Sequence, residues 1–174
     1  MNASTEILVR MIDQAFDRRS WHGTNLRGSI RGMDASEAAW RPSGRGHNIW
    51  EIVVHAAYWK YVVRRRLLGE KRGSFPLRGS NWFERPVSGP GGEAEWQSDV
   101  ELLVSTHRRL REAAALLTRG ELSRAGDGGQ VTNFALLTGI AAHDLYHAGQ
   151  IQLLKRLRAG RRRVSGALEE QNAD

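Results

Sequence analysis

Three histidines have the side chains and the spacing to hold a metal ion. His143 and His147 are four residues apart, and His55 lies far upstream in a separate apolar segment. Side chains four apart on a helix lie about 5–6 Å apart at Cβ, so both imidazoles can reach one ion. Three protein ligands and one open position form the usual catalytic zinc site. A lone His-x-x-x-His pair is more often solvated or bonded in a core, so the third histidine is what favours a shared metal site.

A long helix is predicted to position His55. It spans 48–68, with Asn48 as N-cap and Glu51 at the capping-box position. Gly69 stands where a C-cap glycine belongs. Apolar residues recur through this segment at helical spacing, and His55 falls on the same side as they do. The imidazole of His55 should therefore face the interior.

A second long helix is predicted to carry the other two histidines. It spans 133–158, with Thr132 or Asn133 as its N-cap, and Gly160 is expected to end it. Apolar residues cover a wide arc of this helix, which places it at the centre of its bundle.

Further helices complete the predicted fold. A first long helix begins with Ser4 as N-cap, and short helices are capped by Thr24 and Asp34. A third long helix covers 94–117, after a crossover rich in glycine and proline over 69–92. The sequence predicts an all-α four-helix bundle with short extra helices, a class of fold that builds metal sites between facing helices. Residues 1–160 form the metal-binding domain, and 161–174 form a basic and then acidic tail that is expected to fray.

Composition excludes several function classes. The 174-residue chain has no cysteine, which removes thiolate ligands, a cysteine nucleophile and internal disulfides. No apolar run is long enough to cross a membrane, and the N-terminus does not resemble a signal peptide, so we expect a cytoplasmic protein. The net charge of +7 invites a nucleic-acid interpretation. However, much of the basic charge sits at helix ends, in 64–66 and 155–163, where cations complement the helix dipole.

Three residues near the histidines are candidates for catalysis. Asp144 could accept a hydrogen bond or act as a base, although it points about 100° away from His143, and an exposed or capping role is the alternative. Gln150 could donate near an open metal position, or form an interhelical hydrogen bond. Glu51 could accept the second ring proton of His55, in competition with its capping role.

Other ring side chains have weaker signals. His22 and His47 lie at loop–helix joints that could border the mouth of a site, or simply at the surface. His107 falls on the apolar seam of the third long helix, and a core histidine with a satisfied ring is the favoured interpretation. Tyr58 and Tyr146 are interpreted as packing residues.

Two segments together resemble a known family. Asn48-Ile-Trp-Glu-Ile-Val-Val-His55-Ala-Ala-Tyr-Trp59 and Gly139-Ile-Ala-Ala-His143-Asp-Leu-Tyr-His147-Ala-Gly-Gln150-Ile are similar to motifs of the DinB/YfiT-like metalloenzyme family, the DNA-damage-inducible bundles and not the polymerase. The resemblance implies up-down-down-up connectivity, a metal triad of His55, His143 and His147 with zinc or nickel, a homodimer and a link to the stress response. Some family members transfer low-molecular-weight thiols or use them in isomerisation.

The function predicted from these features is that of a divalent-metal-dependent enzyme acting on a small molecule. A metal-bound water has a pKa of about 7, and a metal-bound thiol is deprotonated, so a thiol-dependent transferase or a hydrolase is the expected class. A zinc-protease interpretation is weaker because Asp144 stands where His-Glu-x-x-His has glutamate. Two alternatives remain: a metal-stabilised binding or sensing domain without catalysis, and, less favoured, a nucleic-acid-binding helical protein.

Overall fold

The chain is helical throughout its regular structure. The computed structural model describes residues 2–42, 46–73, 75–85, 92–125 and 129–171, and within these ranges it contains no strand beyond one isolated bridge between Ala125 and Thr132. The helices are α1 (Ala3–Phe16), α2 (Leu26–Ser29), α3 (Ala35–Ala39), α4 (Ile49–Leu68), α5 (Gly92–Ala115), α6 (Arg119–Leu122) and α7 (Asn133–Gln171). Among the described residues, no helix is both long and apolar enough to cross a bilayer.

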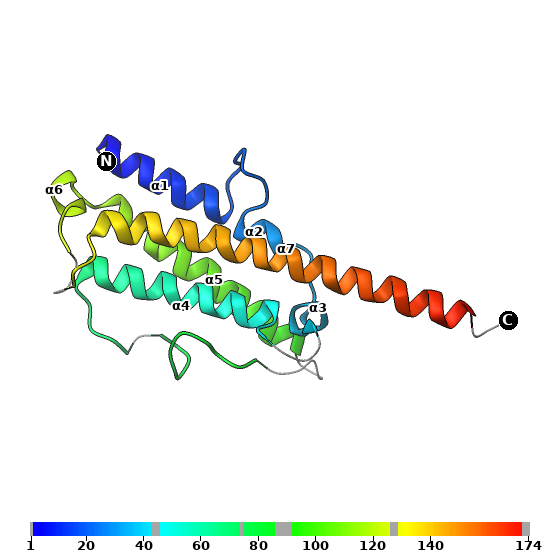
Figure 1. Cartoon of the computed structure of the whole chain (residues 1–174). Coiled ribbons are helices and arrows are strands. Elements are labelled where there is room, and N and C mark those ends of the chain that lie inside the picture. Colours follow the sequence, from blue (N-terminus) through cyan, green and yellow to red (C-terminus); the bar gives the residue numbers. More distant parts are fainter. Residues whose placement is uncertain (1, 43–45, 74, 86–91, 126–128, 172–174) are drawn as a thin grey trace.

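Four long helices form the bundle (Figure 1). α7 packs on α1 and α4, and α5 packs on α4 and α1, so the four helices close a ring. α1 and α7 run in one direction, and α4 and α5 run in the other (Figure 1). The predicted all-α bundle with up-down-down-up connectivity is therefore confirmed. Because α4 and α5 are parallel, the segment between them, called the crossover below, must return along the length of the bundle (Figure 1).

Local chemistry fixes both ends of α4 as predicted. The Asn48 side chain accepts a hydrogen bond from the Glu51 amide at 2.8 Å, and the Glu51 carboxylate accepts one from the Asn48 amide at 3.4 Å. Gly69 ends the helix with a φ of +65°, a left-handed conformation that costs glycine little. These caps set the rotation and register of α4, and with them the inward direction of His55.

Three predicted helix ends are wrong. Asn2, not Ser4, caps α1, because its side chain accepts from the Thr5 amide at 3.0 Å while its amide group donates to the Leu117 carbonyl at 3.2 Å. Asn25, not Thr24, caps α2. The side-chain amide of each asparagine also donates to a carbonyl outside its helix, that of Leu117 for Asn2 and that of Arg18 for Asn25. This second hydrogen bond favours the asparagine over an equally suitable neighbour as the cap.

The third difference is at the end of the last helix. Gly160 does not end α7, which continues to Gln171 and extends beyond the rest of the bundle (Figure 1). A glycine costs only about 1 kcal/mol in a helix interior, and Gly160 does not adopt the left-handed conformation of a C-cap. The tail expected over 161–174 thus begins as a continuation of α7.

The core divides into two apolar clusters with a polar layer between them. On α4, the first cluster reaches Ala57 and the second begins at Val63. On α7, the second cluster reaches Ala141, and the first resumes at Ile151. The intervening turns of these two helices carry the buried polar residues Lys60, Asp144 and His147. The otherwise apolar core thus contains a layer of buried polar side chains, which need hydrogen-bond or ion-pair partners to offset their desolvation.

Candidate metal centre

The three predicted histidines meet where the polar layer borders the first apolar cluster. His55 projects from α4, and His143 and His147 project from successive turns of α7. The Nε2 atom of His143 lies 3.1 Å from Nε2 of His55 and 3.1 Å from Nε2 of His147. One ligand nitrogen from each ring falls within 4.8 Å of the other two. We call these three residues the histidine cluster.

Two rings of the histidine cluster have acceptors on their outer nitrogens. Nδ1 of His55 donates to the Asn81 carbonyl at 2.8 Å, and Nδ1 of His147 donates to the Gln150 side-chain oxygen at 2.7 Å. The Gln150 amide nitrogen donates in turn to the Tyr146 hydroxyl at 3.0 Å, which turns the amide oxygen towards His147. A neutral imidazole has one N–H, so both Nε2 atoms present bare lone pairs to the shared point.

These features fit a divalent ion. Two nitrogens about 2.0–2.1 Å from one tetrahedral zinc lie about 3.3 Å apart, close to the two separations of 3.1 Å that involve His143. Nδ1 of His143 is buried and has no hydrogen-bond partner among the described residues. Without an ion, the Nε2 of His143 can donate its proton to only one of its two neighbours. An ion would engage the Nε2 lone pairs of all three rings, with an oxygen acceptor outside two of them, as metal-bound histidines usually have.

Burial keeps the imidazoles neutral. Desolvation lowers the pKa of His143 to about 3 and that of His147 to about 4, and the neighbouring histidines add to the effect. Desolvation also lowers the pKa of His55, although its hydrogen bond to the Asn81 carbonyl opposes this. Neutral rings are the form that binds metal, so the cluster is ready for an ion at any pH near neutrality.

The crossover supplies one wall of the site. Trp82 stacks on His55, with ring centroids 3.8 Å apart and an interplanar angle of 11°. The other face of the Trp82 ring stacks on His47, with ring centroids 3.5 Å apart. Of the two histidines at loop–helix joints, His47 borders the site through Trp82, whereas His22 lies on the exposed joint between α1 and α2. Stacking between two histidines fixes Trp82 as a cover over the cluster.

Glu51 has the capping role, the alternative to accepting the second ring proton of His55, and it does not accept that proton. Glu51 is buried, but its carboxylate binds Arg41 and the ring of His47, in addition to capping α4. The Nδ1 of His55 donates to the Asn81 carbonyl instead. Glu51 contacts the site through His47, which stacks on Trp82.

The expectation that Asp144 is exposed or caps a helix is wrong. Its side chain is fully buried and forms an ion pair with Lys60, which is itself fully buried. Burial raises the pKa of Asp144 and lowers that of Lys60, while their mutual attraction opposes both changes. Asp144 thus joins α7 to α4 one residue beyond His143, and its partner is a lysine rather than a ligand ring.

Gln150 matches the predicted vicinity of the site but not the predicted direction. Its oxygen accepts from His147, so it orients a candidate ligand and does not cross to another helix. Tyr146 receives the amide proton of Gln150 and is largely exposed. Tyr58 packs against Phe75, in agreement with a packing role.

Sequence reasoning missed the contributions of Lys60, Asn81 and Trp82. Lys60 has a visible signal, since it is four residues after Ala56 and three before Val63 on the inner stripe of α4. Asn81 has a φ of +66°, a conformation that asparagine tolerates better than most residues. Its role depends on where a crossover 26 residues after His55 returns in space, and no local pattern reports that.

Comparison with known proteins gives one match. The family model described as the DinB superfamily matches residues 18–151, which include the whole histidine cluster. Neither curated proteins nor solved structures match the chain.

Proposed function

The chain belongs to the DinB superfamily, and we propose that it is a divalent-metal-dependent enzyme whose ion is held by His55, His143 and His147. The observation that supports this most is the convergence of three Nε2 atoms, two of them with an oxygen acceptor on the opposite ring nitrogen. Burial alone would not orient lone pairs towards a common point. Three protein ligands leave at least one position for a substrate.

The proposed chemistry is a thiol-dependent transfer or a hydrolysis on a small molecule. A zinc or nickel ion bound there would supply a deprotonated water or thiol at neutral pH. The chain has no cysteine, so a thiol nucleophile would come from a low-molecular-weight thiol as cosubstrate. The protein's own residues orient the ligand rings and cover the site. Asn81 and Gln150 fix the tautomers of His55 and His147, and Trp82 stacks over His55.

The first experiment is elemental analysis of protein purified without an affinity tag. We expect about one zinc or nickel per chain, followed by turnover in a screen of electrophiles with low-molecular-weight thiols. Metal without any turnover would favour a non-catalytic role. Absence of metal, with no uptake by the purified protein, would contradict the proposal at its first step.

The alternative is a binding or sensing domain stabilised by its metal. One observation favours it: the histidine cluster joins α4 to α7 between two apolar clusters, so an ion there would also hold the bundle together. The two functions predict different ligands at the fourth coordination position of the ion. An exchangeable ligand that a small thiol displaces indicates an enzyme, and a closed shell indicates a structural site.

We also propose that the protein forms a homodimer through α7. Tyr146, Leu153 and Leu157 are exposed large side chains at helical spacing on one face. Light scattering should show a dimer, and Leu153→Glu should shift it towards monomer. Leu116→Glu, at an exposed residue beyond the end of α5, is the matched control and should leave the mass unchanged.

A further inference from the structure

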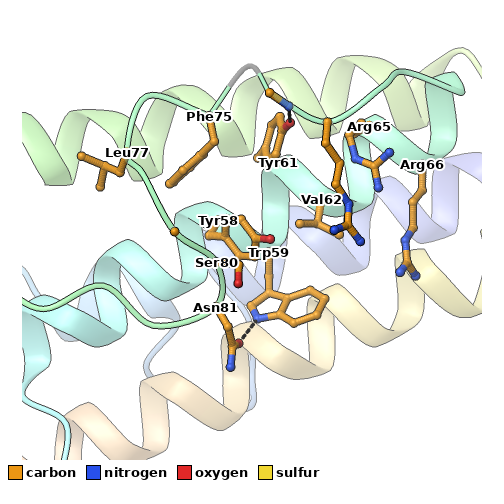
Figure 2. Close-up of a pocket in the computed structure, with 13 residues that line it drawn as sticks. Tyr58, Trp59, Tyr61, Val62, Arg65, Arg66, Phe75, Leu77, Ser80 and Asn81 are labelled. Atoms are coloured by element: carbon orange, nitrogen blue, oxygen red, sulfur yellow. Dashed lines mark hydrogen bonds between the residues drawn. The ribbon is translucent and has the colours of Figure 1, made fainter.

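A cavity of about 340 Å³ lies between α4 and the crossover, next to the histidine cluster but lined by different residues (Figure 2). One wall is aromatic. Phe75 from the crossover lies 5.3 Å from Tyr58 and 5.4 Å from Tyr61, both on α4, between ring centroids. The Tyr61 hydroxyl accepts a hydrogen bond from the Gly73 amide at 3.2 Å, which fixes that ring. The wall is thus a preformed apolar surface.

The opposite end of the cavity is cationic. Arg65, Arg66 and Arg72 line it, and no aspartate or glutamate is among its lining residues (Figure 2). Arg65 is committed to the Glu70 carbonyl, and the Glu70 carboxylate binds Arg64, outside the cavity. The guanidinium groups of Arg66 and Arg72 have no hydrogen-bond or ion-pair partner within the described part of the chain. Two uncompensated guanidinium groups beside an apolar wall attract an anion.

The cavity reaches the metal site through two shared residues. Trp59 and Asn81 line it, and the Trp59 indole donates to the Asn81 side chain at 3.0 Å. On the other side, the Asn81 carbonyl accepts from His55, and the Trp59 ring lies 6.3 Å from that of His143. In Figure 2, the labelled arginines lie at one side, and Asn81 with Trp59 lies nearest to α7. A ligand anchored at the arginines could extend along the cavity towards Trp59 and Asn81, which border the metal site.

We propose that this cavity binds a small organic anion with an aromatic or other flat body, its carboxylate or phosphate at Arg66 and Arg72 and its body against Tyr58, Tyr61 and Phe75. Guanidinium groups bind carboxylate and phosphate in a bidentate manner, and the rings provide the apolar contact. Occupation of the cavity does not require a metal. That the same molecule is the substrate of the metal centre rests on the proposed function.

The test uses phenyl phosphate as probe on the metal-free full chain. Binding is followed by the NMR signal of the Trp59 indole N–H, identified by its loss in Trp59→Phe, and by titration calorimetry. We expect saturable binding, at least tenfold weaker for inorganic phosphate and for benzyl alcohol. Phenylacetate in place of phenyl phosphate tells whether the anion preferred is a carboxylate or a phosphate, and tighter binding of either supports the site.

Two double variants decide whether the arginines are responsible. Arg66→Gln/Arg72→Gln should weaken phenyl phosphate binding at least tenfold. Arg10→Gln/Arg78→Gln removes the same charge at exposed positions outside the cavity and should change it less than twofold. Equal losses in both, equal affinity for benzyl alcohol, or no binding at all would overturn the proposal.

The metal-site variant His147→Ala separates this proposal from the previous one. It should retain phenyl phosphate binding, because His147 does not line the cavity. Binding that appears only after zinc is added, and disappears in His147→Ala, would place the anion on the metal and would likewise overturn the cavity site. Thermal unfolding of each variant confirms that it is folded before its affinity is compared.

Discussion

The bundle buries histidines in two settings that differ in what surrounds each ring. His55, His143 and His147 turn their Nε2 atoms towards one another, and desolvation lowers the pKa of each. His107 on α5 is as buried as His55, and desolvation lowers its pKa to about 2. Its ring, however, stacks on Phe16 with centroids 3.7 Å apart. Burial and a lowered pKa are common to both settings, so only the convergence of lone pairs distinguishes a candidate ligand from a core residue.

The surroundings of His107 contain buried polar groups that pair with one another and do not converge on one point. Lys60 and Asp144 form their buried ion pair here, and the Lys60 ammonium lies 4.9 Å from the centre of the Phe16 ring. The nearest acid to His107 is Asp13, at 3.9 Å, and that carboxylate is engaged with Arg111. The charges named here have partners of opposite sign, whereas the histidine cluster brings three neutral rings together with no charged partner.

The largest effect should come from breaking the buried ion pair. Lys60→Met leaves Asp144 buried without its cation and should lower the free energy of unfolding by about 3–5 kcal/mol in urea denaturation. The double variant Lys60→Met/Asp144→Leu should recover most of that loss, because an apolar pair replaces both charges. If the double variant were as unstable as the single one, the pair would have a role beyond mutual neutralisation.

The second effect concerns the candidate ligands. His147→Ala should reduce zinc affinity by more than about 100-fold, since loss of a ligand should exceed the 10–100-fold cost of losing an outer partner. His107→Leu is the control from the other setting and should keep the wild-type affinity. Competition against a chromophoric chelator measures both variants. Stoichiometric zinc in His147→Ala at wild-type affinity would remove His147 from the site.

A smaller loss should follow from removing an orienting partner. Gln150→Leu takes away the oxygen that accepts from Nδ1 of His147, while all three ligands stay in place. Zinc affinity should fall about 10–100-fold, which the same chelator competition resolves. Gln152→Leu, at a partly buried glutamine two residues further along α7, should leave affinity unchanged. Equal values for Gln150→Leu and wild type would mean that this hydrogen bond does not orient the ligand.

The smallest expected effect, taken per pH unit, is a change in the pH dependence of stability. The pKa of His107 is lowered in the folded protein, so below about pH 6.5 the unfolded chain binds the extra proton and the free energy of unfolding falls as pH falls. One such histidine contributes up to about 1.4 kcal/mol per pH unit. His107→Leu should therefore flatten the stability of the metal-free protein between pH 6 and 4 by about that slope. An unchanged slope would show that His107 is protonated in the fold.

Sequence alone goes far for features that depend on local periodicity. The four long helices and the inward direction of His55 follow from apolar spacing and from the caps at Asn48 and Gly69. The pair His143 and His147 follows from one helical turn. The DinB superfamily match covers the three histidines that the motifs singled out.

Features that depend on the return of the chain in space were not predictable. Asn81 reaches His55 because the crossover folds back over α4, and Trp82 is held there by stacking between two histidines. The partner of Asp144 is 84 residues away, and only the packing of α4 on α7 selects it. The hydrogen-bond acceptors and the stacked tryptophan around the histidine cluster could therefore not be predicted from the sequence, although the cluster itself could.

The most direct test of the central claim is X-ray absorption spectroscopy at the zinc edge of protein loaded with one equivalent of zinc. Convergence of His55, His143 and His147 predicts three imidazole nitrogens at about 2.0–2.1 Å and one further light ligand that exogenous thiol replaces with sulfur at about 2.3 Å. A site with fewer than three imidazoles, or a protein that takes up no zinc, would contradict the account.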